Sequence, residues 1–303
     1  MKTIGIVGFG VIGQRWAAAF AHHGFDVRVH DPDPEAPARF AALRDGLFAD
    51  LAELHGPAIA PGEIEVFDDM AEALAGVDYV QESGPEALDL KQALLAEIER
   101  HVEDEVIIAS SSSALLVTEM QARCARPERI VLAHPFNPAH IMPLVEIVGG
   151  EQTAPDVPAR ARAVYDAIGK KPVLLTREIT GHLALRLMGA MWREAIALLR
   201  DGVASVEDID RAFIYGPGPK WGVQGAFISN GLNAEGMAEF LRKYGQTYED
   251  IWADLGDATL NAETREIVAT AAERLLQDRE ALRADRDAAI VSMLKLIGER
   301  GPL

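Results

Sequence analysis

A histidine and a glutamate in the segment 129–148, RIVLAHPFNPAHIMPLVEIV, are the residues of this sequence best suited to chemistry. His134 follows an apolar run typical of a buried strand, and Glu146 stands inside the next such run. A carboxylate among apolar neighbours is costly unless it is paired, and a nearby imidazole would pair it. The carboxylate would also fix the tautomer of the imidazole, which makes His134 a candidate general base. On spacing alone, a pair that only stabilises the core is equally consistent.

Three glycines near the start of the chain predict a dinucleotide-binding turn. Gly8, Gly10 and Gly13, in GFGVIG, follow a strand pattern and open a helix pattern. In that context the first permits a tight turn, the second lets a pyrophosphate approach the backbone, and the third lets helix pack on strand. Free N–H groups at the helix start favour the phosphates. A tight strand–helix turn without a ligand is the structural alternative.

An aspartate at the end of the second predicted strand indicates which dinucleotide binds. Asp31 follows DVRVH and can accept hydrogen bonds from both hydroxyls of an adenosine ribose. A carboxylate there repels a 2′-phosphate, and no arginine follows at 32–34. The sequence therefore predicts NAD rather than NADP. With NAD accepting a hydride, His134 would take the proton of the alcohol that is oxidised.

Two further polar segments follow predicted strands. IIASSSSAL at 107–115 places four serines where ligands bind to parallel sheets, so one of them could hydrogen-bond a reacting oxygen, although a solvated turn is the commoner interpretation. VQESGPEALDLK at 80–91 places Glu86 and Lys91 near another strand end. The simpler interpretation of Glu86 is an acid that stabilises the start of a helix, and that of Lys91 is a lysine on the solvated face of the helix.

The elements that must position these residues alternate between strand and helix patterns up to about residue 180. Strands are predicted at 3–8, 26–31, 63–67, 77–81, 105–109, 129–133, 144–148 and 172–176. Only helical patterns follow, at 182–202, 205–213, 235–255 and 261–298. The predicted fold is α/β: a Rossmann-type, doubly wound, mostly parallel sheet in a domain at 1–180, followed by an all-helical domain at 181–303.

The composition narrows the class of protein. The 303 residues include 29 Lys and Arg against 47 Asp and Glu, a net charge of −18, which disfavours nucleic acid and anionic membranes as partners. The single cysteine, Cys124, cannot form an internal disulfide and suits a reducing, cytoplasmic compartment. No apolar run of about 20 residues would span a membrane. No metal site is predicted.

Taken together, these motifs resemble the L-3-hydroxyacyl-CoA dehydrogenase superfamily over nearly the whole chain. The segments that carry the resemblance are GFGVIG, VQESGPEALDLK, SSSSAL, AHPFNPAHIMPLVEIV, GHLALRL and DIDRAFIYGPG. Within the superfamily, LNAEGM at 232–237 and MWREA at 191–195 resemble the branch of L-gulonate 3-dehydrogenase (lambda-crystallin) and L-carnitine dehydrogenase.

The resemblance implies residue roles that spacing alone leaves open. It makes His134 the general base, Glu146 its partner and Ser113 the serine that hydrogen-bonds the substrate hydroxyl. It also implies a cofactor-binding set made of the glycine turn and the strand ends: Gly8, Gly10, Val11, Ile12, Gly13, Asp31, Glu86 and Lys91. Relatives of this kind form dimers through the helical domain, so a homodimer is expected.

One position departs from the family pattern. Where the family carries an asparagine that assists the catalytic site, this chain has Leu185, which cannot hydrogen-bond. Either another group, such as His182 or Asn137, takes over that role, or the substrate differs, or the chemistry is slower. Lys220, in YGPGPKWG, stands where this branch tends to carry arginine and could hold a substrate carboxylate; a solvated loop lysine is the alternative.

The expected activity is NAD-dependent oxidation of the hydroxyl of a small L-3-hydroxy acid, such as L-gulonate or L-carnitine, to the 3-oxo acid. Three alternatives remain. A 3-hydroxybutyryl-CoA dehydrogenase is disfavoured by the lack of an obvious basic cluster for a CoA phosphate. A non-catalytic, crystallin-like NAD(H)-binding protein is favoured only by Leu185. An amine- or imine-reducing relative is the third.

Overall fold

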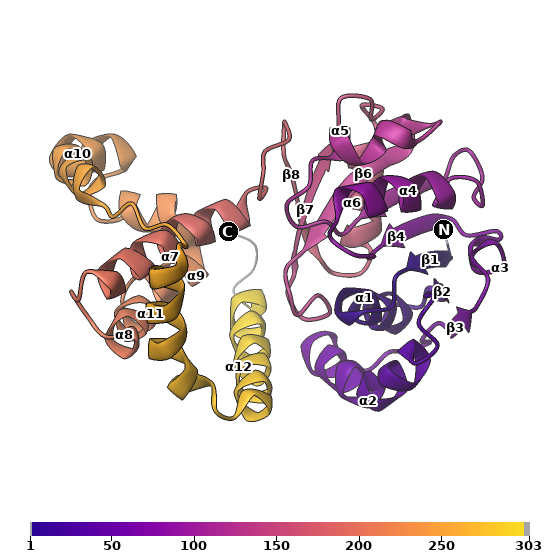
Figure 1. The fold of residues 1–303 in the computed structure, drawn as a ribbon, viewed down its shortest axis with the longest axis horizontal. Helices are drawn as coiled ribbons and strands as arrows, with labels where there is room; N and C mark the ends of the chain where they lie inside the picture. The colour runs from indigo at the N-terminus through magenta and orange to yellow at the C-terminus, as the bar shows by residue number, and fades with distance from the viewer. Residues whose placement is uncertain (1, 300–303) are drawn as a thin grey trace. The chain divides into compact units, whose positions relative to one another are not determined.

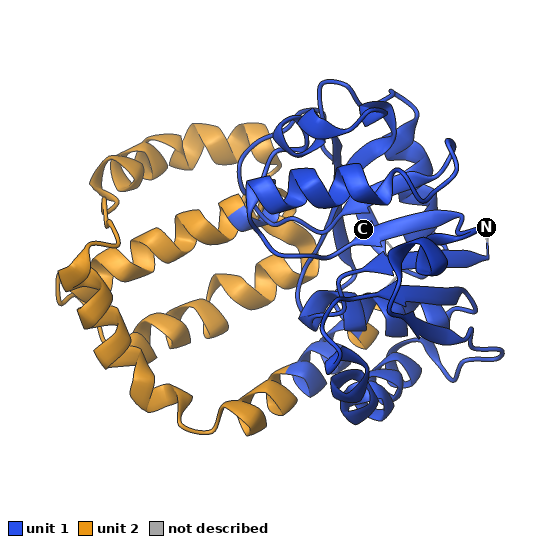
Figure 2. Cartoon of the chain, turned by 45° about the vertical axis from the view of Figure 1, so that its right-hand side comes forward, with its two compact units in different colours: residues 1–185, 287–294 blue, residues 186–286, 295–303 orange. Residues whose placement is uncertain are grey.

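The computed structural model describes residues 2–299, which form two compact units (Figure 2). Of these residues, unit 1 comprises 2–185 and 287–294, and unit 2 comprises 186–286 and 295–299. The segment 287–294, far along the chain, therefore groups with the N-terminal unit. No helix among residues 2–299 combines the length and the apolar character needed to cross a bilayer.

Unit 1 is built on a single eight-stranded sheet (Figure 1). Its strands are β1 (Thr3–Val7), β2 (Asp26–His30), β3 (Ile64–Phe67), β4 (Tyr79–Glu82), β5 (Ile107–Ser110), β6 (Ile130–Pro135), β7 (Leu144–Gly149) and β8 (Lys171–Leu174). Their order is β3-β2-β1-β4-β5-β6-β7-β8, and every neighbouring pair is parallel except β6 and β7. The predicted doubly wound, mostly parallel α/β fold is confirmed.

Helices cover both faces of this sheet because its strands are apolar on both sides, as parallel strands usually are. One face packs against α1 (Val11–His22), α2 (Ala36–His55) and α6 (Val157–Asp166). The other face packs against α3 (Met70–Leu74), α4 (Leu88–Ile98) and α5 (Val117–Met120). Alternation along β1 decides which side chain meets which layer: Ile6 joins the first core and Val7 the second.

The chain beyond β8 is helical, as predicted. Its helices are α7 (Ala184–Arg200), α8 (Val206–Tyr215), α9 (Pro217–Gly231), α10 (Met237–Asp254), α11 (Ala262–Glu273) and α12 (Arg279–Glu299). Ser205 caps α8 by accepting a hydrogen bond from the Asp208 N–H.

The segment 261–298 is helical, as predicted, but it is divided, because the chain turns through a short 3₁₀ segment, Arg274–Leu276, between α11 and α12. The loop in the alternative interpretation of Lys220 is wrong. YGPGPKWG is not a loop, because α9 begins at Pro217. Proline lacks the N–H that a first-turn residue leaves unused, and its fixed φ is already helical, so the proline marks a helix start.

Candidate active site

A groove of about 440 Å³ lies at the carboxyl ends of β1, β2 and β4. It is lined by Val7, Gly8, Gly10, His30, Asp31, Pro32, Met70, Ser83, Gly84, Pro85 and Leu94. The chain runs outward from β1 to β2 and β3 in one direction and to β4 and β5 in the other, so the groove marks the point where the strand order reverses. Open α/β sheets bind their ligands at this switch point.

The three predicted glycines have distinct structural reasons. Gly8 has φ +95°, and a Cβ there would lie 2.6 Å from the carbonyl of Ser83. A Cβ on Gly13 would lie 1.9 Å from the Gly8 oxygen, so α1 packs on β1 only with glycine at that place. A Cβ on Gly10 would meet nothing within 4 Å. Protein packing therefore explains two of the glycines, and the open space at Gly10 fits a phosphate that approaches the backbone.

Asp31 is held against this glycine turn. Its Oδ2 accepts a hydrogen bond from the backbone N–H of Phe9, and its Oδ1 accepts one from Asp33 N at 2.8 Å. Next to the turn, Val11 is 59% exposed at the first position of α1, while Ile12 packs against the core. The turn, the helix start and the acid predicted for NAD thus lie together at one end of the sheet.

Lys91 is buried, so the interpretation as a solvated helix face is wrong. Its Nζ lies 2.7 and 3.0 Å from the two carboxylate oxygens of Glu82 and 3.0 Å from the carbonyl oxygen of Gly84. Ser110 Oγ donates to Glu82 Oε2 at 2.6 Å. Both members of the ion pair are essentially inaccessible to solvent, at 1% and 0% exposure. Lys91 thereby fixes the backbone of Gly84, which lines the groove.

Glu86 organises the loop that contains the serines. Its Oε1 accepts hydrogen bonds from Ser112 Oγ at 2.7 Å, Ser113 N at 2.9 Å and Ala114 N at 3.0 Å. Burial alone would raise the pKa of Glu86, but these hydrogen bonds outweigh it and hold the pKa below its usual range. Glu86 is therefore a hydrogen-bond acceptor for the serine loop and not only a helix-start acid.

The four serines differ in what their hydroxyl groups bind. Ser110 donates to Glu82, Ser111 bonds Gln81 and Ser83, and Ser112 donates to Glu86. Ser113 is exposed, and its hydroxyl has no partner within the part of the chain that the structure describes. Its Oγ is thus the serine hydroxyl of this loop left available to a ligand.

His134 and Glu146 face each other across the antiparallel strands β6 and β7. His134 Nδ1 lies 3.0 Å from Glu146 Oε2, while Glu146 Oε1 accepts hydrogen bonds from Leu183 N at 2.7 Å and Ala184 N at 2.8 Å. Burial of this fully inaccessible carboxylate would raise its pKa, but the bonds from His134 and the two backbone N–H groups outweigh burial and lower it. Glu146 is therefore ionised at neutral pH.

An ionised Glu146 determines the tautomer of His134. A carboxylate is only an acceptor, so Nδ1 of His134 carries the proton and Nε2 keeps a lone pair. The ring is 5% exposed and packs beside His182, with ring centroids 5.3 Å apart. The pair can accept a proton at Nε2 and stabilise the resulting imidazolium, which is the chemistry of a general base.

The loop after His134 is anchored by a buried lysine that sequence reasoning missed. Lys170 Nζ donates to the carbonyl oxygens of Ala139 at 2.6 Å, His140 at 3.0 Å and Met142 at 2.9 Å. Burial lowers the pKa of Lys170 to about 7. A lone lysine beside a strand gives no sequence signal, because its acceptors are backbone atoms.

Asn137, in the same loop, is exposed.

Two other predicted positions lie after β8. Leu185 is half-buried in the first turn of α7 and offers no polar atom. Lys220 belongs to unit 2, where it is exposed in the first turns of α9.

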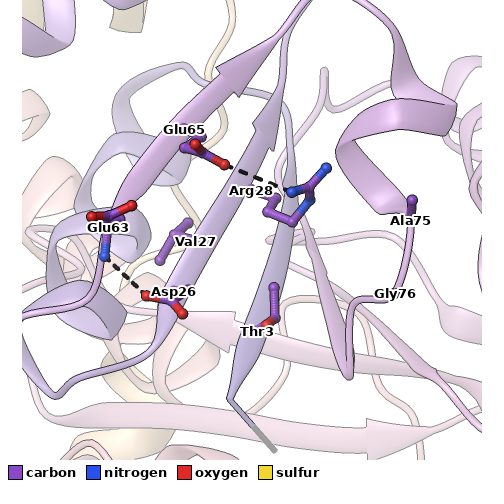
Figure 3. A pocket seen from close by; sticks show the side chains of 8 residues that line it. All are labelled: Thr3, Asp26, Val27, Arg28, Glu63, Glu65, Ala75 and Gly76. Atoms are coloured by element: carbon purple, nitrogen blue, oxygen red, sulfur yellow. Dashed lines mark hydrogen bonds and ion pairs between the residues drawn. The ribbon is translucent and has the colours of Figure 1, made fainter.

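A second pocket lies at the opposite, amino-terminal ends of β1, β2 and β3, around Thr3, Asp26 and Glu63 (Figure 3). Its cation, Arg28, pairs with Glu65 at 3.7 Å, donates to backbone carbonyls of α3 and lies over the ring of Phe67. The guanidinium of Arg28 is thus used within the protein, and the carboxyl-end groove remains the candidate site.

Comparison with known proteins gives matches along the whole chain. Residues 3–179 match the family described as 3-hydroxyacyl-CoA dehydrogenase, NAD binding domain, and residues 181–261 match its C-terminal domain. The L-carnitine dehydrogenase of Oceanobacillus iheyensis is 37% identical over 308 residues, covering 100% of both chains. That of Streptomyces coelicolor is 36% identical, covering 100% of this chain and 96% of the relative.

Among solved structures, an NAD⁺-dependent dismutase, 5-formyl-3-hydroxy-2-methylpyridine 4-carboxylic acid 5-dehydrogenase, superposes with a TM-score of 0.89 at 28% identity. The match covers 98% of this chain and 99% of that one.

Proposed function

Given that this chain belongs to the 3-hydroxyacyl-CoA dehydrogenase family, we propose that its substrate is L-carnitine or a closely similar small L-3-hydroxy acid. The protein is an NAD-dependent dehydrogenase, as the family and its full-length relatives are. The observation that carries the choice of substrate is the full-length similarity to L-carnitine dehydrogenases from separate organisms.

In the proposed reaction His134 is the general base. Its Nε2 takes the proton of the substrate hydroxyl while Nδ1–H stays bonded to Glu146, whose negative charge stabilises the imidazolium. Bound NAD supplies the hydride acceptor for the hydrogen on the carbinol carbon. The C–O single bond becomes a C=O bond, and the proton remains on His134. Ser113 Oγ, free of protein partners among residues 2–299, donates to the reacting oxygen.

Two residues are proposed to bind the rest of the substrate. Asn137 offers an exposed amide three positions beyond the base, and Lys220 offers an exposed ammonium that would pair with a carboxylate. As a point charge on a flexible stem, Lys220 would attract the carboxylate without fixing its orientation as tightly as an arginine.

NADH formation tests the substrate. The protein is mixed with NAD and, in separate reactions, L-carnitine, D-carnitine, L-gulonate, L-3-hydroxybutyrate and L-3-hydroxybutyryl-CoA. We expect the highest kcat/KM with L-carnitine and at least about 100-fold less with D-carnitine, because the wrong stereoisomer places its C–H away from the cofactor. A higher kcat/KM with the CoA ester or with L-gulonate would overturn the choice.

The same assay separates the alternatives. An aldehyde arm, with a pyridine carbaldehyde bearing a carboxylate, is included because the dismutase structure superposes over nearly the full chain. NADH binding without turnover in any arm would favour a non-catalytic, NAD(H)-binding protein.

Replacing Asp31 by serine is expected to weaken discrimination between the two dinucleotides. We expect kcat/KM with NAD to fall about 10- to 100-fold, because one or two hydrogen bonds to a charged group are lost. The kcat/KM with NADP should rise relative to that with NAD, because the negative charge that repels the 2′-phosphate is removed. The measurement is the ratio of kcat/KM for the two cofactors. Asp33→Ser is the matched control, since Asp33 does not line the groove. An unchanged ratio in Asp31→Ser would contradict the role of Asp31.

A homodimer is proposed through the helical unit. Among its described residues, the buried apolar side chains are those of Ile196, Ala197 and Phe240. Trp192 is 52% exposed and Phe227 is 84% exposed. A unit that stays monomeric seldom leaves apolar side chains of this size open to solvent. Light scattering after gel filtration should give twice the chain mass of 32.8 kDa. The monomer mass at micromolar concentration would contradict the dimer.

A cytoplasmic location also remains a prediction.

A further inference from the structure

His182 is a buried imidazole next to the proposed base and has no role in the reaction described so far. It is 1% exposed, and its ring centroid lies 5.3 Å from that of His134. Its Nε2 lies 3.3 Å from the carbonyl oxygen of Ser112. Its Nδ1 is buried without a hydrogen-bond partner among residues 2–299. The ring therefore lies between the serine loop and the catalytic pair.

The backbone of His182 also serves this pair. Within the described chain, His182 is the one non-glycine residue with positive φ, at 51°, and Gly181 before it has φ 74°. These two left-handed residues turn the chain just before α7. The turn brings the N–H groups of Leu183 and Ala184 to Oε1 of Glu146, at 2.7 and 2.8 Å. Two of the bonds that keep Glu146 ionised thus depend on this turn.

The conformation alone does not explain why the residue is histidine. Glycine adopts φ near 51° without the steric clash between Cβ and the following carbonyl that any other residue meets. A strained residue of this kind persists where its surroundings hold it in place. The contacts that glycine would lack are those of the ring with Ser112 and with His134.

The neutral state of His182 suits this position. Burial lowers its pKa, and the neighbouring His134 lowers it further through charge repulsion. The bond to Ser112 and the carboxylates of Glu146 and Glu86 act in the opposite direction, but they do not outweigh burial and His134. A neutral ring adds contacts beside the base without adding a positive charge.

We propose that His182 is a positioning residue that holds the ring of His134 and the loop of Ser113 at a fixed separation, while its backbone directs two N–H groups to Glu146. The proposal rests on the proposed function in one respect, that His134 is the base. It adds that the base is supported from both sides, by Glu146 through a hydrogen bond and by a second imidazole through packing.

Two substitutions separate the backbone from the ring. His182→Gly keeps the left-handed turn and removes the ring, whereas His182→Phe keeps a ring of similar size and removes both nitrogens. With the best substrate of the wild type, we expect kcat to fall about 10- to 100-fold in His182→Gly, because displacement of a base by about 1 Å has effects of that size. We expect a smaller fall in His182→Phe and less than about a 2-fold change in KM for NAD in either.

A second measurement does not need a substrate. The ¹⁵N chemical shifts of the imidazole nitrogens, assigned with the help of His134→Ala, report the tautomer of His134. We expect the tautomer protonated at Nδ1 in both proteins, because Glu146 stays ionised, but a broadened Nε2 resonance in His182→Gly, because the ring of His134 loses the neighbour that packs against it. His101→Gln is the control, because His101 pairs with Glu97 at the surface and should leave both measurements unchanged.

The outcomes distinguish the two claims. Wild-type kcat and a His134 Nε2 resonance as sharp as in the wild type would overturn the positioning role in His182→Gly, even if the melting temperature falls. A wild type that oxidises none of the hydroxy acids would contradict the proposed function instead, and the ¹⁵N spectra would still test His182.

Discussion

Replacing His134 by alanine is expected to lower kcat about 10³- to 10⁴-fold and to leave the affinity for NADH within about 2-fold of wild type. A positioned general base contributes a factor of this order, and without it water must take the hydroxyl proton. The groove at the glycine turn is lined by the ends of β1 and β2, the loops that follow β1, β2 and β4, and one residue each of α3 and α4, so loss of a side chain on β6 should not alter it. Steady-state rates and NADH fluorescence titration measure the two quantities.

The matched substitution is Glu146→Gln. It keeps the size of the side chain and an acceptor oxygen for the N–H groups of Leu183 and Ala184, but removes the charge that stabilises the imidazolium. We expect a smaller loss of kcat than in His134→Ala. A near-normal rate in His134→Ala would show that the pair serves only stability, the interpretation that its spacing leaves open.

The parts of the site that sequence predicts well are those whose requirement is local. The glycine turn is one: Gly8 has the positive φ of 95° that the turn itself needs, and Gly13 must leave room for the oxygen of Gly8 five residues earlier. Asp31 is another, because the end of the second strand lies beside the turn in any sheet of this order. The helix start at Pro217 is equally local, since proline at the first helical position is a signal in the sequence itself.

The parts that sequence predicts poorly depend on distant partners. The pairing of His134 with Glu146 requires β7 to run antiparallel to β6, the one exception in the sheet, and no spacing rule specifies that. The same holds for Lys170, which binds carbonyl oxygens. Similarly, the choice of Ser113 among four serines depends on which hydroxyl groups Glu82, Gln81 and Glu86 have already bound.

Lys91 illustrates the limit most clearly and leads to the second large effect. On the helix pattern it is a charged residue at a solvated face, yet its partner Glu82 ends β4 and both are buried. Lys91→Met is expected to lower the free energy of unfolding by about 3–5 kcal/mol, because it leaves Glu82 as a buried, unpaired charge. Urea denaturation followed by far-UV circular dichroism measures it.

The double variant Glu82→Gln/Lys91→Met tests the cause. With no charge left to desolvate, it should recover most of the lost stability, since replacing both members of a buried pair is often nearly neutral. If Lys91 instead acts mainly by contacting the cofactor, Lys91→Met would raise the Kd for NADH at nearly wild-type stability. The double variant would then bind NADH as weakly as the single one. The geometry favours the first outcome, because all three recorded bonds of the Lys91 ammonium are to Glu82 and Gly84.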